Sequence, residues 1–340
     1  MKSIWLRAAF GAALLLSTTS FANAQSNGRL LFLNTTTGDC LLGGVDVGGY
    51  LHTPDNMIED NTCPVSGLAG MTDLVPTSAG ILAYQPSGGS GTVLLLDSLD
   101  FLYGHTKTLS AGWTNIVAFG NYLLFYKSPN IGAVLYVTSN GGTQQTQSIS
   151  DFSRWSQITA TDNYLFFYEE STGAFAVGTI IADAGTFYET DSGSGIATGY
   201  TVIASLGDDL LLYNPATGAY EIGSIYFTAG LKDFFDKRSS GKLAEGYHQA
   251  IRSGGYLLLY DGAVGTAAIG YISQAGTWVQ TQKMTLPRWT SIVAAGTHIL
   301  FYNSVSGNVQ ISYIAPNGTL ANTSSQTIGT KFNRVVATRQ

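Results

Sequence analysis

The sequence predicts an all-β protein, a seven-bladed β-propeller built from four-stranded antiparallel blades. The first observation is an internal repeat of 42 to 47 residues that contains several strand-length apolar runs. The second is a set of 41 glycines among 340 residues, which supplies turns at short intervals. The third is that the two ends of the chain each carry part of one repeat. Four strands per unit at this period are typical of propellers.

Each repeat begins with a large side chain. The seven opening residues are Met71, Trp113, Trp155, Tyr200, Tyr247, Trp289 and Phe332. A tyrosine follows thirteen residues after each of the first six, at Tyr84, Tyr126, Tyr168, Tyr213, Tyr260 and Tyr302. Two apolar runs and a turn lie between the two anchors, which predicts a first and a second strand.

A glycine five residues after the tyrosine predicts a hairpin into a third strand. Asn214 to Gly218 and Asn303 to Gly307 have the composition of such turns, with an Asn that caps its own backbone and a Gly that takes positive φ. Third strands are expected at 219–225 and 308–314. A polar, Thr-rich segment then supplies the fourth strand.

The two ends of the chain complete one shared blade. Residues 331–337 form a first strand, after which the sequence stops, and residues 28–38 begin at a second strand with Leu33 in the tyrosine position. We therefore expect a C-terminal strand to join an N-terminal three-stranded partial blade. This closure removes exposed sheet edges.

Residues 1–24 have the pattern of a secretory signal. Lys2 and Arg7 precede a short apolar run, and Ala22-Asn23-Ala24 is a small-residue cleavage site. We expect residues 25–340 to form one domain, exported to the periplasm or the exterior, without membrane insertion and monomeric.

Charge and cysteine content restrict the partners and the redox state. Without Lys2 and Arg7, 14 basic residues face 22 acidic ones, a net charge of about −8, which argues against nucleic acid as a partner. Cys40 and Cys63 are the two cysteines of the sequence, and export favours a disulfide between them. Two unrelated thiols are the alternative.

The repeat resembles known secreted propellers. Its motifs Trp113-Thr-Asn-Ile-Val-Ala118 and Ile299-Leu-Phe-Tyr-Asn303 are loosely similar to those of tachylectin-like lectins and of FG-GAP/VCBS-type propellers. The aspartate-rich calcium loops of the latter are missing here. The lectin resemblance implies glycan binding, by analogy with the fold.

Candidate ligand-binding residues lie two positions after each opening residue. This polar ring comprises Asp73, Asn115, Gln157, Val202, Gln249, Ser291 and Arg334. If the first strand is innermost, the ring lines the central channel, where propellers commonly bind ligands; a solvated channel without a ligand is the alternative. Trp278 occurs once, in a fourth segment, and suits either sugar stacking or surface packing. Inter-blade packing is favoured over sugar stacking for the opening aromatics.

No enzyme signature is recognised. The four histidines lack metal-ligand spacing, and the nearest approach to a nucleophile elbow, Gly88 to Thr92, has Thr in place of its last glycine. We therefore expect no metal, no cofactor and a non-catalytic, carbohydrate-binding module. A protein-interaction scaffold at the cell envelope, using one face and a charged insertion at 227–246, is the alternative; a second insertion spans 46–70.

Overall fold

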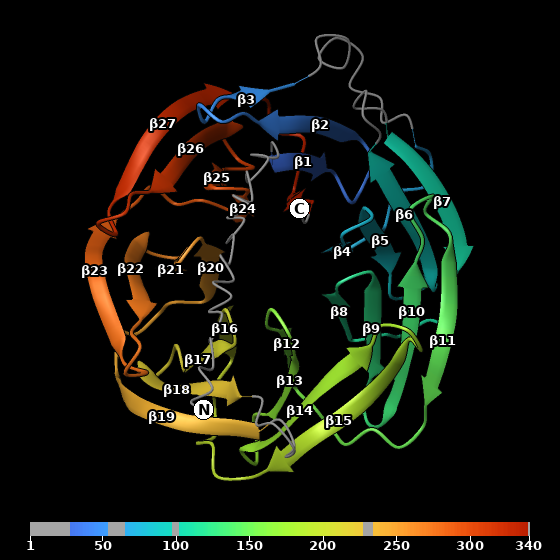
Figure 1. The fold of residues 1–340 in the computed structure, drawn as a ribbon. Coiled ribbons are helices and arrows are strands. Elements are labelled where there is room, and N and C mark those ends of the chain that lie inside the picture. Colours follow the sequence, from blue (N-terminus) through green and yellow to red (C-terminus); the bar gives the residue numbers. More distant parts are fainter. Residues whose placement is uncertain (1–27, 54–64, 97–101, 227–233, 339–340) are drawn as a thin grey trace, which may run out of the picture.

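The seven blades predicted from the repeat are present and surround a central channel (Figure 1). The computed structural model describes residues 28–53, 65–96, 102–226 and 234–338. The described residues form strands and turns without any helix, and they hold no helix long and apolar enough to cross a membrane. The signal segment and Cys63 lie outside the described residues, so the signal and the disulfide remain predictions.

Each blade is a four-stranded antiparallel sheet. Four of the seven blades are β4(Asp73–Pro76) β5(Ile81–Gln85) β6(Ser90–Leu96) β7(Leu102–Thr108), then β8(Asn115–Phe119) β9(Tyr122–Lys127) β10(Ile131–Val137) β11(Thr143–Ile149), then β12(Gln157–Ala160) β13(Leu165–Glu169) β14(Ala174–Ile181) β15(Thr186–Gly193), and β16(Val202–Leu206) β17(Asp209–Tyr213) β18(Ala219–Tyr226) β19(Phe234–Lys242). The others are β20(Gln249–Ser253) β21(Tyr256–Tyr260) β22(Thr266–Ile272) β23(Trp278–Thr285), then β24(Ser291–Ala295) β25(His298–Tyr302) β26(Asn308–Ile314) β27(Leu320–Thr327), and the closing blade of β28(Arg334–Ala337) with β1(Gly28–Leu33) β2(Cys40–Val45) β3(Leu51–His52).

The closing blade joins the two ends of the chain as predicted. Strand β28 pairs antiparallel with β1, with Leu31 opposite Val336 and Leu33 opposite Arg334. Phe332 is buried against Phe32 of β1, in the same blade, and in one cluster with Tyr302 of the neighbouring blade. The ring is therefore closed by main-chain pairing and by core packing together.

The core lies between blades. The second strands supply runs that are fully buried on both faces, such as Leu210 to Tyr213 and Leu257 to Tyr260. Each cluster of buried side chains combines adjacent blades; one packs Phe166 and Tyr168 against Leu210 and Leu212. A single blade has no other partner for these faces, which explains why the apolar pattern recurs.

The repeated tyrosine links each blade to the next. All six tyrosine side chains are buried, and each hydroxyl donates to a carbonyl in the loop before the next blade. Tyr260 donates to the carbonyl of Pro287 at 2.9 Å and accepts from the backbone N–H of Trp289 at 2.7 Å. The spacing of thirteen residues places this hydroxyl against the opening residue of the following blade.

The charged insertion at 227–246 is not one long loop. Residues 234–242 form β19, the outermost strand of its blade, and Asp236, Lys237 and Arg238 lie on it. Their charge suits a solvent-facing outer strand. Within the other insertion, at 46–70, the structure places the short strand β3.

Candidate functional site

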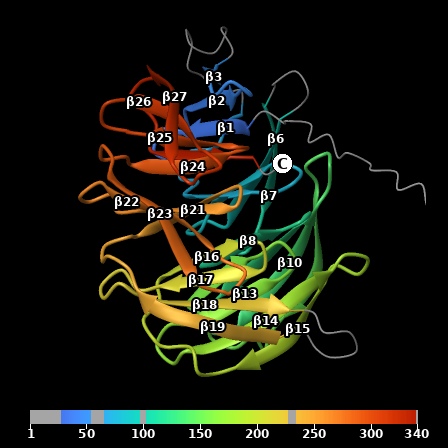
Figure 2. The ribbon, with the colours of Figure 1, turned by 60° about the vertical axis from the view of Figure 1, so that its left-hand side comes forward.

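The first strand of every blade lies nearest the centre of the ring, as Figure 1 shows, and Figure 2 gives the same blades turned by 60°. Each ring residue is the first residue of its inner strand, so the polar ring lies at one mouth of the channel. Each also lies directly opposite the repeated tyrosine in the sheet, or opposite Leu33 in the closing blade. The seven residues therefore share one height along the channel, and all except Arg334 are half-buried.

A cavity of about 380 Å³ opens beside three neighbouring members of the ring. Asp73, Asn115 and Arg334 supply its polar side chains, together with Thr72 and Thr114. Its floor is apolar and comes from β4, β8 and β28, through Leu74, Ile116 and Val336. These strands are distant in sequence, and closure of the ring brings Arg334 beside Asp73.

The carboxyl group of Asp73 is electrostatically unusual. Burial raises the pKa of Asp73 above its ordinary value, and the positive charge of Arg334 opposes this rise. A carboxyl with a raised pKa beside a guanidinium in a cleft is typical of acid–base sites. The amide of Asn115 adds a neutral donor on the neighbouring strand.

The remaining ring residues complete the mouth without entering this cavity. Gln157, Gln249 and Ser291 begin β12, β20 and β24, and Val202 interrupts the polar set at β16. The cavity lining contains none of these four. The two charged residues of the ring, Asp73 and Arg334, therefore lie together at this cavity, and the other ring residues are neutral.

The opposite mouth has a different character. Arg252, on β20, forms an ion pair with Asp162, in the turn after β12, and the two blades are separated by the blade of β16. The channel beside them is lined mainly by aliphatic residues of β4, β8, β12 and β16. The two ends of the channel therefore differ, with the polar ring at one and the Arg252–Asp162 ion pair at the other.

The opening aromatics are packing residues, as favoured from the sequence. All seven are at most 8% exposed. Trp113 contacts Phe125 and Trp289 contacts Phe301, each on the second strand of its own blade. Trp113 also belongs to a buried cluster that contains Leu82 and Tyr84 of the preceding blade.

Trp278 also packs, and the structure does not bring it to the ring. It begins the outer strand β23, and its ring covers Gly270, where an added Cβ would lie 2.4 Å from the indole. Phe187 covers Gly178 and Phe235 covers Gly223 in the same way. Each aromatic lies two residues before the partner of its glycine. Trp278 therefore occupies a repeated aromatic position, which is Phe in the other two blades. Its contacts support the packing interpretation.

Comparison with known proteins gives the fold and no sequence family. No protein-family model matches the chain, and no curated protein matches it in sequence. Among solved structures, the chain is similar to a protein of Bacteroides fragilis provisionally named a 6-phosphogluconolactonase, with 15% identity, a TM-score of 0.65, and coverage of 94% of this chain and 99% of that one. It is also similar to a periplasmic gluconolactonase of Pseudomonas aeruginosa, with 15% identity, a TM-score of 0.61, and coverage of 92% and 99%. AztD of Citrobacter koseri matches with 14% identity, a TM-score of 0.54, and coverage of 92% and 97%.

These comparisons correct the expected function. At this identity they establish the propeller alone, but the named neighbours are lactonases and AztD, not lectins. The expectation of a non-catalytic carbohydrate-binding module, with a scaffold as its alternative, is contradicted by these matches. The physical reason for the error is that a propeller site takes one residue from each of several blades. A search for contiguous enzyme motifs cannot recognise such a site.

The sequence predicts Asp73, Asn115 and Arg334 as candidate residues of one ring, but not that these three line one cavity. The predicted closing blade could have indicated this grouping, because Arg334 lies in that blade and the closing blade is next to the first complete blade, which carries Asp73. Within the described residues, no group of three or more His, Cys, Asp or Glu side chains could hold a metal ion.

Proposed function

We propose that the protein is an exported hydrolase that opens lactones, or closely related cyclic esters, at the polar mouth of the channel. The observation that carries this proposal is that a half-buried Asp73 and Arg334 line one cavity at the channel mouth, where the charge of Arg334 acts on the carboxyl group. The names of the structurally similar lactonases support the choice of substrate class. The signal-like N-terminus and the periplasmic location of one such neighbour support export.

The reaction requires a base and a site for negative charge. In the proposed reaction, the carboxylate of Asp73 takes a proton from water as the water oxygen attacks the lactone carbonyl carbon. Arg334 and Asn115 donate hydrogen bonds to the carbonyl oxygen as it becomes negative. When the ring C–O bond breaks, the leaving alkoxide takes the proton from Asp73, and the product is the open hydroxy acid.

The raised pKa of Asp73 suits this cycle. A carboxylate with an ordinary pKa is a weak base near neutrality, whereas one with a raised pKa accepts a proton more readily. Arg334 keeps a useful fraction of the group ionised by lowering the same pKa.

The test is a lactonase assay on residues 25–340, with glucono-δ-lactone and γ-butyrolactone followed by acid release in a pH-stat. We expect turnover above the spontaneous rate, and a loss of about a hundredfold or more in kcat/KM for Asp73→Asn. Asp183→Asn is the matched control, because Asp183 is exposed in the turn between β14 and β15. A folded protein without turnover of either lactone, or an Asp73→Asn variant with full activity, would refute the proposal.

A further inference from the structure

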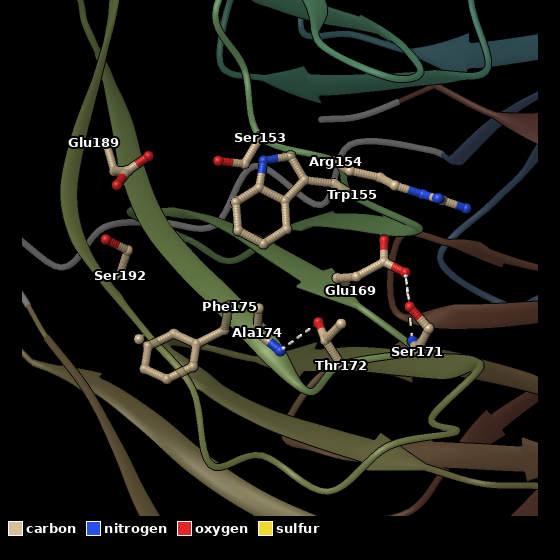
Figure 3. A pocket seen from close by; sticks show the side chains of 11 residues that line it. Ser153, Arg154, Trp155, Glu169, Ser171, Thr172, Ala174, Phe175, Glu189 and Ser192 are labelled. Carbon is tan, nitrogen blue, oxygen red and sulfur yellow. Dashed lines mark hydrogen bonds between the residues drawn. The ribbon is translucent and has the colours of Figure 1, made fainter.

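A second pocket lies away from the channel, on the blade of β12 to β15 (Figure 3). It has a volume of about 500 Å³ and shares no lining residue with the cavity at the channel mouth. The end of the β13–β14 hairpin forms one side, and the loop that carries Trp155 covers another. The outer strand β15 contributes Glu189 and Gly193.

The lining contains a residue that departs from the repeat. In four of the other six blades the position after the tyrosine, or after Leu33 in the closing blade, is Asn34, Asn214, Asp261 or Asn303, whose side-chain oxygens accept hydrogen bonds from the backbone of their own hairpins. Gln85 and Lys127 occupy it in the remaining two. Glu169 holds this position on β13, and its Oε1 accepts from the Ser171 hydroxyl at 2.6 Å and from the Ser171 N–H at 3.4 Å. The capping role is therefore met by one carboxylate oxygen.

The second carboxylate oxygen of Glu169, Oε2, takes no part in this hairpin cap. Glu169 is 7% exposed, and its Oε2 is buried without a hydrogen-bond partner among the described residues. Trp155 is 6% exposed, and its Nε1 is likewise buried without one. Leaving a buried polar group unpaired costs free energy, about 1–3 kcal/mol and more for a charge. A ligand that supplies a donor to Glu169 and an acceptor to Trp155 would relieve both costs.

Charge and shape restrict that ligand. The lining carries two carboxylates, Glu169 and Glu189, against the single guanidinium of Arg154. Trp155 and Phe175 provide aromatic surface. Gly193 leaves room for the Phe175 ring, because a Cβ at that position would lie 2.9 Å from it.

We propose that this pocket binds a small hydroxylated amine, with its ammonium group hydrogen-bonded to Glu169 Oε2 and a hydroxyl oxygen accepting from Trp155 Nε1. A charge-assisted hydrogen bond to a buried carboxylate is roughly twice as strong as a neutral one. The protonated amine should therefore be preferred over the corresponding alcohol. The inference is independent of the proposed lactonase activity, and its test uses no lactone.

The experiment is calorimetric titration of residues 25–340 with 1-amino-1-deoxysorbitol and with sorbitol, which differ only in the amine, in an amine-free buffer at pH 7. We expect the amine to bind at least about tenfold more tightly than sorbitol. Glu169→Gln, which keeps an oxygen for Ser171, should abolish this preference. Asp261→Asn, at the matching hairpin position of another blade, should retain it.

A third variant separates the two contacts. Trp155→Phe removes the donor and should weaken both ligands by a similar factor while preserving the preference for the amine. Circular dichroism checks that every variant is folded. Equal affinities for amine and alcohol, absence of binding up to about 50 mM, or an unchanged preference in Glu169→Gln would each overturn the proposal.

Discussion

At the scale of single residues, the repeated tyrosine does more than fill space. Its ring lies within one blade, and its hydroxyl accepts and donates at the loop that opens the next blade. The hydrogen bond from the Trp289 N–H is buried, and the one to the Pro287 carbonyl is partly buried. This explains why the spacing is invariant while the opening residue varies from Met71 to Trp289.

Replacement of Tyr260 by Phe should therefore destabilise the protein without altering its packing volume. The carbonyl of Pro287 and the N–H of Trp289 each lose a partner, and we expect a loss of about 1–3 kcal/mol in the free energy of unfolding. Urea denaturation followed by tryptophan fluorescence measures this loss. Tyr188→Phe is the control, because Tyr188 is 54% exposed. Equal stability of the two variants would contradict the account.

A second prediction at this scale concerns the pH dependence of the proposed lactonase. The charge of Arg334 lowers the pKa of Asp73, so Arg334→Gln should raise that pKa further. A general base works when it is deprotonated, and the acid limb of the pH–rate profile should therefore move to higher pH. Measurement of kcat/KM from about pH 4, near the reference pKa of Asp, to about pH 8 tests the direction in which the acid limb moves. A limb that stays in place, or moves to lower pH, would separate Arg334 from Asp73.

At the scale of elements, the three outer strands β15, β19 and β23 each carry an aromatic side chain that lies against a glycine. Phe235 of β19 covers Gly223 of β18, where an added Cβ would lie 2.1 Å from the ring. The register shifts at this glycine, as it does at Gly178 and Gly270. In these three blades the bulge and the aromatic occur together, and the aromatic holds an otherwise polar strand against its blade. The pairs β10–β11 and β26–β27 have a similar register shift without a glycine there.

Gly223→Ala should cost about 1–3 kcal/mol through overpacking. If the clash with Phe235 is the cause, Gly223→Ala combined with Phe235→Leu should be more stable than the sum of the single changes predicts. A double-mutant cycle of denaturant midpoints measures this coupling. Additive losses would show that the glycine is required by its backbone conformation instead.

The elements also show what the sequence could and could not reveal. Strands of the inner three positions follow from apolar runs and from turns such as Asn214 to Gly218, because burial and turn chemistry are local. The charged composition of residues 227–246 predicts an insertion where the structure has strand β19, because burial of this strand depends on Phe235 alone among charged neighbours. Sequence alone gives no role to Glu169, because its difference from the residues at the same position matters only once the hairpin geometry is known. The grouping of Asp73 with Arg334 depends on ring closure, which links positions more than two hundred residues apart.

At the scale of the whole molecule, one strand links stability and the proposed chemistry. Strand β28 pairs with β1, seals the last edge of the ring, and carries Arg334 to the channel mouth. The segment also buries Phe332 and Val336 between blades. Burial of two large apolar side chains contributes roughly 3–6 kcal/mol, a large part of the stability of an ordinary domain.

A chain that ends at residue 330 should therefore unfold at a much lower urea concentration, and a peptide of residues 331–340 added in trans should restore stability. The same peptide should restore lactone hydrolysis, whereas a peptide with Arg334→Gln should restore the fold but leave kcat/KM depressed. A scrambled peptide of equal composition should do neither, because pairing with β1 requires Val336 and its neighbours in register. If the truncated chain is as stable as the complete one, the ring does not depend on this closure. If both native and Arg334→Gln peptides restore equal activity, the guanidinium has no part in the reaction.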